Sequence, residues 1–415
     1  MPDSPDDRAR RRLTATLFAG NTLSSTSLIL AITVATLAAA NLTGDPRLAG
    51  LPSAASTFGA ASGASALAAA STRFSRRRPF IVWFLVAVAG ATLAATSLEA
   101  RSFALLVVGM FVIGFGRSVD QVARFAAADM RPPERRGSAI AVIVWAATVG
   151  SVVGPLLLEP SAAVARSVGL QSLGGAYGFS AIGFLTAAAL LAVFLRPDPL
   201  SLSVADDPDD DGAVETSAPV RELLRRPTVQ LALSAMLTSQ LVMVLVMTMT
   251  PLHIEIAGGT LGVIGWVMMA HTLGMFALSP VTGRLVDRLG PRRMIIVAIG
   301  VLAVACGSAA TAADAQTPIL LGSLFLLGLG WNFGFVAGST ELQVGLGIGE
   351  RVRLQGIADA VTWISGGTGA LASGFILGAF SYPVLALVGH ALSAIPIRFL
   401  LKTRRLAAQS IASSA

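Results

Sequence analysis

Apolar stretches long enough to cross a lipid bilayer recur along almost the whole chain. A membrane-spanning helix needs about 20 mostly apolar residues. Such stretches lie at 13–40, 48–72, 79–98, 102–128, 138–158, 174–195, 227–251, 261–283, 294–313, 317–345, 354–380 and 383–401. Hydrophobic residues make up 54% of the chain and charged residues only 13%, about half the charged share of a soluble domain. The sequence therefore predicts an all-α membrane protein with 12 transmembrane helices.

A polar segment divides these stretches into two sets of six. Residues 198–219 are acidic and contain several prolines, which makes them too hydrophilic to pack in a core. We predict an N-terminal six-helix bundle over 1–196, a cytoplasmic linker over 197–226 and a C-terminal six-helix bundle over 227–415. Segments 134–154 and 350–374 both run from a Glu-Arg turn into an apolar stretch with a central Trp and spaced glycines. This likeness predicts two pseudo-symmetric halves with the substrate bound between them.

Basic residues predict the orientation of the chain in the membrane. Nearly all of them fall in alternate turns, in the N-terminal segment and in the tail, which the positive-inside rule assigns to the cytoplasm. Only Arg47, Arg101 and Arg166 fall in the opposite turns. Both termini are therefore predicted to be cytoplasmic. We interpret the net charge of +7 as a consequence of this topology and expect no nucleic-acid partner.

Soft metal-ligand side chains are concentrated in two neighbouring spans. Met243 and Met247 are spaced i,i+4, as are His271 and Met275, so each pair lies on one face of its helix. Thioether sulfur and neutral imidazole suit Cu(I) and are poor ligands for Mg²⁺ or Ca²⁺. We predict these four residues as metal ligands, with copper as a transported substrate and no permanently bound cofactor. Seven of the 11 methionines belong to this region: Met236, Met243, Met247, Met249, Met268, Met269 and Met275.

Each candidate ligand also has a structural interpretation. A histidine in a span can form a hydrogen bond between helices, and methionine fills gaps in any apolar core. Met249 and His253 form a further i,i+4 pair near the outer end of their span, where His253 could collect metal or simply anchor the helix. We expect Pro251 to kink the helix there. Met236, Met268 and Met269 are assigned to packing.

Charged residues inside the spans leave two interpretations open. Arg117, Asp120 and Arg124 lie on or near one helix face, where Asp120 could be an ion-pair partner or a proton-coupling group. Glu341 and Asp359 lie near the inner ends of their spans. Salt bridges between the halves are the simpler interpretation for both, and a proton relay is the alternative.

Two sets of motifs carry a family resemblance. GRLVDRLGPRR (283–293) resembles the loop signature of the major facilitator superfamily, whose equivalent at 72–79 keeps only the basic run. The segments VMVLVMTMTPLHI (242–254), AHTLGMFALSP (270–280) and GLGWNFGFVAGST (328–340) are similar to the CcoA-like bacterial copper importers. The resemblance implies Met-x-x-x-Met at Met243 and Met247, and His-x-x-x-Met at His271 and Met275. It also implies copper import across the bacterial cytoplasmic membrane, in support of cytochrome oxidase assembly.

The predicted function is therefore that of a secondary copper importer, a monomer whose partners are copper and the bilayer. The alternative is a carrier of an organic solute such as riboflavin or a drug, because a riboflavin-transporting group shares the scaffold. Such a cavity would be lined by Trp145, Trp331, Asn332 and Trp363. A membrane sensor or assembly factor is disfavoured because no loop is long enough to form a domain. The chain has no Gly-Lys-Ser/Thr phosphate loop, and we expect no enzymatic activity. The oxidation state of the copper taken up and the energy source are left open.

Overall fold

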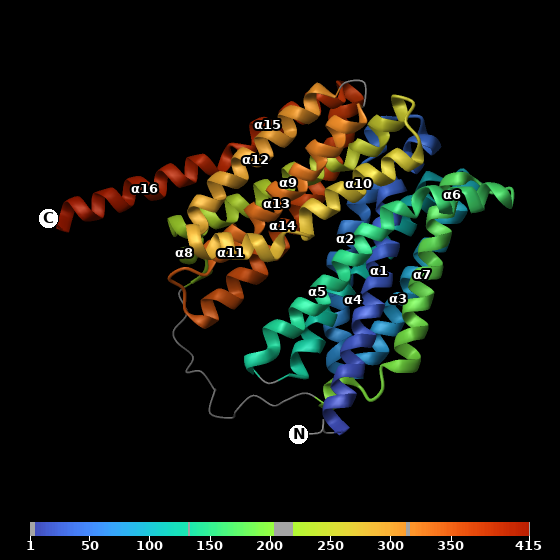
Figure 1. The fold of residues 1–415 in the computed structure, drawn as a ribbon, viewed down its shortest axis with the longest axis horizontal. Coiled ribbons are helices and arrows are strands. Elements are labelled where there is room, and N and C mark those ends of the chain that lie inside the picture. Colours follow the sequence, from blue (N-terminus) through green and yellow to red (C-terminus); the bar gives the residue numbers. More distant parts are fainter. Residues whose placement is uncertain (1–4, 132, 203–218, 313–315, 415) are drawn as a thin grey trace. The chain divides into compact units, whose positions relative to one another are not determined.

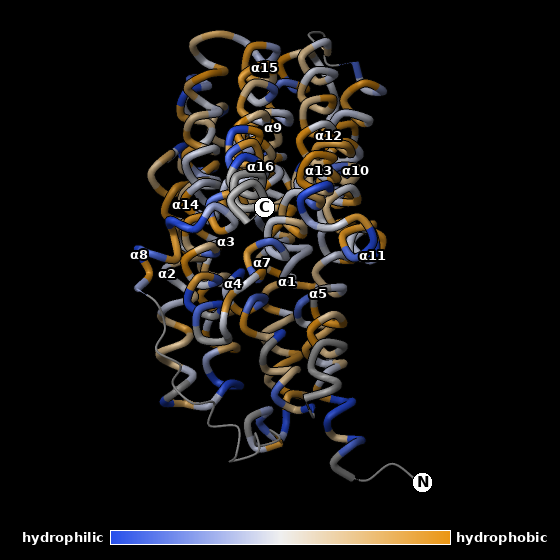
Figure 2. The backbone as a smooth tube through the Cα atoms, turned by 90° about the vertical axis from the view of Figure 1, so that its left-hand side faces the viewer, coloured by the Kyte–Doolittle hydropathy of each residue, from blue (hydrophilic) through white to orange (hydrophobic). Residues whose placement is uncertain are grey.

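The computed structural model describes residues 5–131, 133–202, 219–312 and 316–414, and all regular structure within these ranges is helical (Figure 1). The predicted all-α membrane fold is confirmed. Among the described residues, eleven helical segments are long and apolar enough to cross a membrane. The predicted second span forms a helix as well, α2 (Leu51–Phe74), but alanine, serine and glycine keep its hydropathy low. Figure 2 shows hydrophobic residues along most helices and hydrophilic ones at the beginning of α1.

The contacts divide the chain into two compact units. Unit 1 comprises Met1–Asp210 and Ile254–Met269, and unit 2 comprises Asp211–His253 and Ala270–Ala415. The predicted domain boundaries at 196 and 227 stay a prediction, and residues 203–218 of the predicted linker lie outside the described part of the chain.

Unit 1 is built around its first helix. Its elements are α1 (Pro5–Thr43), η1 (Pro46–Leu48), α2, α3 (Arg77–Glu99), α4 (Phe103–Asp129), α5 (Pro133–Leu156), α6 (Leu158–Ser167), α7 (Ser172–Phe194) and η2 (Pro199–Leu202). Helix α1 packs against α4, α5 and α7. Small residues permit this close packing: Gly150 of α5 lies directly against the backbone of α1, and Gly114 of α4 lies against that of α2.

Unit 2 surrounds a buried helix, α9 (Pro227–Ile256). The last three residues of α9, together with residues 261–269 of the helix that follows it, belong to unit 1. The remaining elements are α8 (Val220–Leu223), α10 (Leu261–Phe276), α11 (Ser279–Leu289), α12 (Pro291–Thr311), α13 (Thr317–Leu342), α14 (Ile348–Ala379), α15 (Tyr382–Ser393) and α16 (Ile395–Ser414). Helix α9 is continuous through Pro251. Glycines in the neighbouring helices face it, including Gly334 and Gly338 of α13 and Gly366 and Gly369 of α14.

Two predicted spans are broken, which the hydropathy pattern did not reveal. The span predicted at 261–283 consists of α10 and α11, and the span predicted at 383–401 consists of α15 and the beginning of α16. In both cases the second residue of the following helix is a proline, Pro280 or Pro396. Proline has no N–H for the carbonyl four residues earlier and its ring crowds that carbonyl. The break after α10 lies next to Met275, one of the predicted ligands.

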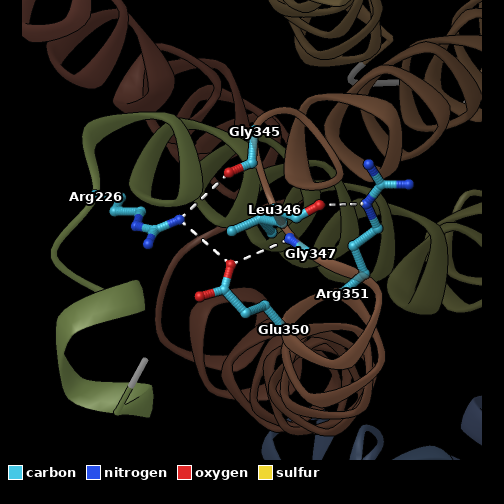
Figure 3. A network of polar contacts seen from close by, with 6 residues as sticks. All are labelled: Arg226, Gly345, Leu346, Gly347, Glu350 and Arg351. Atoms are coloured by element: carbon cyan, nitrogen blue, oxygen red, sulfur yellow. Dashed lines mark hydrogen bonds and ion pairs between the residues drawn. The ribbon is translucent and has the colours of Figure 1, made fainter. Parts of the chain in front are cut away.

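Ionic contacts join helices at the predicted cytoplasmic end of unit 2. Arg226 Nη1 lies 3.4 Å from the Gly345 carbonyl and 3.5 Å from Glu350 Oε2, which also accepts from the Gly347 amide (Figure 3). These contacts tie the start of α9 to the connection between α13 and α14.

Another contact corrects the interpretation of Glu341. Arg292 Nε donates to Glu341 Oε1 at 2.8 Å, and both residues belong to unit 2. This ion pair therefore joins α12 to α13 and does not connect the two halves. The carboxylate is almost completely buried, whereas the arginine remains partly exposed near the start of α12.

Candidate functional site

His271 is the most distinctive of the predicted ligands in the structure. Its side chain is completely buried in α10, and its Nδ1 lies 2.9 Å from the carbonyl oxygen of Leu324 in α13. A carbonyl can only accept a hydrogen bond, so Nδ1 carries the proton and Nε2 carries a lone pair. Within the described residues, Nε2 is buried without a hydrogen-bond partner. The imidazole is thus held in the tautomer whose Nε2 lone pair is buried and available to bind a metal ion.

Glycines hold the His271 segment tightly against α13. A Cβ atom at Gly328 would meet the His271 carbonyl and would lie 2.8 Å from the Met275 amide nitrogen. A Cβ atom at Gly274 would in turn meet the backbone of Phe325. Only glycine fits at these two positions without moving one helix, so the backbone of α10 lies in direct contact with that of α13.

Helix α9 packs on α13 in the opposite chain direction. Three contacts define the register of the two helices: Gln240 with Trp331, Ser239 with Gly334, and Met236 with Gly338. If the same register continues for one to two turns toward the C-terminal end of α9, Met243 is expected at the level of Gly328 and Met247 at the level of Leu324.

On α10, the His271 side chain reaches the Leu324 carbonyl and the Met275 backbone lies against Gly328. From the register of α9 we expect Met247 at the level of His271 and Met243 at the level of Met275. Met243 is 4% exposed, and Met247 and Met275 are partly exposed. No group of three or more His, Cys, Asp or Glu side chains gathers in the described residues. A metal ion at these levels would therefore depend on thioether sulfur.

Sequence analysis missed Gln240, which lies one turn from Met243 on α9. Trp331 Nε1 donates to Gln240 Oε1 at 2.7 Å, and the indole contacts the ring of Phe276 edge-on at 5.9 Å and stacks on that of Phe335 at 5.3 Å. This aromatic cluster links α9, α10 and α13. The signal in the sequence was an amide in the middle of an apolar span, where a polar side chain needs a partner.

Met249 and His253 do not form an open metal entrance. The His253 ring stacks on Tyr382 at a centroid distance of 4.1 Å, and its Nε2 bonds to the Ala312 carbonyl at 2.8 Å. Met249 is completely buried. These contacts favour the alternative that the sequence left open, in which His253 anchors the outer end of α9.

Asn332 also differs from its expected role as part of an organic-solute cavity. Its side chain is 3% exposed and binds the Met275 carbonyl together with the hydroxyls of Ser279 and Thr282. It is therefore committed to contacts between helices.

Unit 1 contains a separate polar cluster around Asp120. The hydroxyls of Ser24 and Ser25 lie 3.1 and 3.3 Å from Asp120 Oδ2, so α1 is tied to α4. Asp120 Oδ1 is buried without a hydrogen-bond partner in the part of the chain that the structure describes. Hydroxyls of α1 thus hold one oxygen of this carboxylate, and its pairing with Arg117 or Arg124 stays a prediction.

The family is decided by a comparison with family models. The model of the Major Facilitator Superfamily matches residues 15–340 and 232–413. The chain belongs to this superfamily. It is therefore a multi-pass membrane transporter and not an enzyme, as the sequence predicted.

Three relatives place this superfamily member more closely. It is 33% identical to the uncharacterized transporter YddS of Bacillus subtilis over 87% of this chain and 84% of the relative, and 33% identical to YdeG of the same organism over 88% and 86%. It is 30% identical to the riboflavin transporter RfnT of Brucella anthropi, over 89% of both chains. None of these three names refers to copper, and the finer resemblance to copper importers stays a prediction.

Solved structures share the fold. A bacterial homologue of the human lysosomal transporter Spinster, in its inward-facing and occupied conformation, gives a TM-score of 0.74 at 16% identity, with 97% of this chain and 98% of that chain covered. A D-xylose–proton symporter gives 0.69 at 16% identity, with 93% and 97% covered. These likenesses concern the major facilitator fold alone.

Proposed function

We propose that this major facilitator transporter imports copper across the bacterial cytoplasmic membrane along a path of thioether and imidazole donors in unit 2. The observation that carries the proposal is the free Nε2 of His271, a lone pair buried in a span with its tautomer fixed by Leu324. In metal sites, a ligating histidine commonly donates its other ring N–H to a carbonyl or a carboxylate. A buried polar atom without a partner is rare and calls for an explanation.

The surrounding donors support Cu(I) as the species bound within the membrane. From the register of α9 on α13 we expect Met247 at the level of His271 and Met243 at the level of Met275. Soft neutral donors match Cu(I) and discriminate against hard divalent ions. Because thioether sulfur and imidazole bind Cu(I) less tightly than a thiolate, we expect moderate binding, so that the ion can step from one donor pair to the next, which transport requires. In this arrangement both termini are cytoplasmic, and the imported copper serves cytochrome oxidase assembly.

A second candidate is riboflavin, because the chain is 30% identical to RfnT. The aromatic cluster around Trp331 would then supply stacking surfaces and Gln240 a hydrogen-bonding amide. This candidate predicts that Trp331 is essential and that the methionines contribute only packing.

Uptake measurements distinguish the two substrates. Cells with and without the protein are supplied with ⁶⁴Cu under ascorbate, and separately with radiolabelled riboflavin, and each substrate is also tested as a competitor of the other. For the copper importer we expect ⁶⁴Cu accumulation that excess riboflavin does not reduce. His271→Ala or Met247→Ala should abolish it at unchanged amounts of membrane protein, whereas Met243→Ala and Met275→Ala should reduce it partially.

His390 provides a matched control for His271. It also bonds a backbone carbonyl through Nδ1, that of Ala303 at 2.8 Å, but its side chain is exposed and no methionine follows one turn later. His390→Ala should leave copper uptake unchanged, as should Met268→Leu, a volume-conserving change at a packing position. Wild-type copper uptake by the His271→Ala, Met247→Ala double variant would reject copper and leave riboflavin as the better candidate.

A further inference from the structure

Asn332 occupies the break between α10 and α11, where it replaces missing main-chain hydrogen bonds. Its Nδ2 donates to the Met275 carbonyl at 2.7 Å and to Ser279 Oγ at 2.8 Å, and its Oδ1 accepts from Thr282 Oγ1 at 2.5 Å. One buried side chain of α13 thus holds the last turn of α10 and the first turn of α11 together.

The need for this clamp follows from the local sequence. Pro280 cannot donate to the Phe276 carbonyl, and the helical hydrogen bonds resume only where Val281 and Thr282 bond to the Leu278 carbonyl. At the same break, the Met275 carbonyl accepts a hydrogen bond from the Asn332 side-chain amide. Because this carbonyl belongs to a predicted ligand, the bond fixes the backbone that carries the Met275 thioether.

We propose that Asn332 is a positioning residue of the candidate copper site, which sets the place of the Met275 sulfur through its bond to the Met275 carbonyl. This proposal rests on the proposed function. Asn332 itself does not touch the ion. Outer partners that orient metal ligands commonly affect affinity about 10–100-fold when they are removed.

The break also gives the clamp a mechanical role. The basic segment 283–293 forms most of α11 and the start of α12, with only Gly290 between them, while α10 carries His271 and Met275. Since Asn332 binds both sides of the break, a movement of α11 changes the support of Met275.

The main test compares Asn332→Leu with Thr282→Val. Both variants remove a hydrogen bond at the break, but only Asn332→Leu removes the bond to the Met275 carbonyl. We expect Asn332→Leu to raise the KM for ⁶⁴Cu uptake about tenfold, and Thr282→Val to change it less than about twofold. Asn332→Ser, which retains a hydroxyl, is measured alongside in case the leucine variant does not reach the membrane, and should give an intermediate KM.

A double-mutant cycle distinguishes positioning from general destabilisation. If Asn332 acts through Met275, adding Met275→Leu to Asn332→Leu should change the KM little further, whereas adding Met243→Leu should multiply the two effects. Equal KM changes for Asn332→Leu and Thr282→Val, or independent effects of Asn332→Leu and Met275→Leu, would overturn the proposal and leave copper import intact. A wild-type protein that does not transport copper would reject the proposed function, and Asn332 would then have no copper site to position.

Discussion

The contact between α10 and α13 permits a prediction whose magnitude follows from the structure. In a Gly328→Ala variant, the new Cβ atom would lie 2.8 Å from the Met275 nitrogen and closer still to the His271 carbonyl. Ordinary contacts begin at 3.4 Å, so the helices must separate by about 0.6 Å at the first atom and by more at the second. Both neighbours are backbone atoms, which cannot rotate away as a side chain would.

This separation acts directly on the candidate ligands. The bond from His271 to Leu324 is 2.9 Å long and would stretch toward the limit of a hydrogen bond. Overpacking of this kind costs about 1–3 kcal/mol, and a displacement of about 1 Å in a functional site can cost about a hundredfold in rate. We therefore expect Gly328→Ala to lower the initial rate of ⁶⁴Cu uptake by about tenfold to a hundredfold.

Gly322→Ala is the matched control on the same helix. A Cβ atom at Gly322 meets nothing within 4 Å, and alanine favours a helix over glycine by about 1 kcal/mol. This variant should transport normally and unfold at an equal or higher temperature. Uptake is measured at equal amounts of membrane protein, alongside thermal unfolding of both purified variants. Equal uptake by Gly328→Ala and Gly322→Ala would refute the idea that the α10–α13 contact sets the ligand geometry.

Three further predictions concern the outer end of α9, the basic loop and the topology. His253→Phe keeps an aromatic ring for the stack on Tyr382 but loses the hydrogen bond to the Ala312 carbonyl. We therefore expect the free energy of unfolding to fall by about 1 kcal/mol and the KM for copper uptake to stay unchanged. An increased KM would instead support a role of His253 in metal entry. Asp287 is an exposed carboxylate near the N-terminus of α12, where a negative charge interacts favourably with the helix dipole. We therefore expect Asp287→Asn to lower the maximal transport rate at unchanged metal affinity. A normal transport rate would show that the segment 283–293 has no role in the transport cycle. A cysteine introduced as Asp210→Cys should react with an impermeant maleimide only in inside-out vesicles, and labelling in intact cells would contradict the predicted orientation.

Much of the fold was predictable because hydropathy is a local property. Segments of about 20 apolar residues form helices in a bilayer, where backbone groups have no other partners. The breaks after α10 and α15 were missed, although Pro280 and Pro396 mark both of them. Proline also occurs within the continuous helix α9, as Pro251, so the residue alone does not distinguish a break from an uninterrupted helix.

The sequence by itself determined which side chains are chemically suited to a soft metal and which of them share a helix face. The spacing of four residues in Met243/Met247 and in His271/Met275 is enough for that, because neighbours one turn apart on a helix are fixed by its geometry. Tertiary structure decided what lies across from them. The free Nε2 of His271 depends on a carbonyl in α13, and both α9 and α10 pack on α13 through its glycines. Glu341, His253 and Asn332 likewise acquired their roles from partners on other helices. Contacts of this kind join residues far apart in the chain, and no local spacing encodes them.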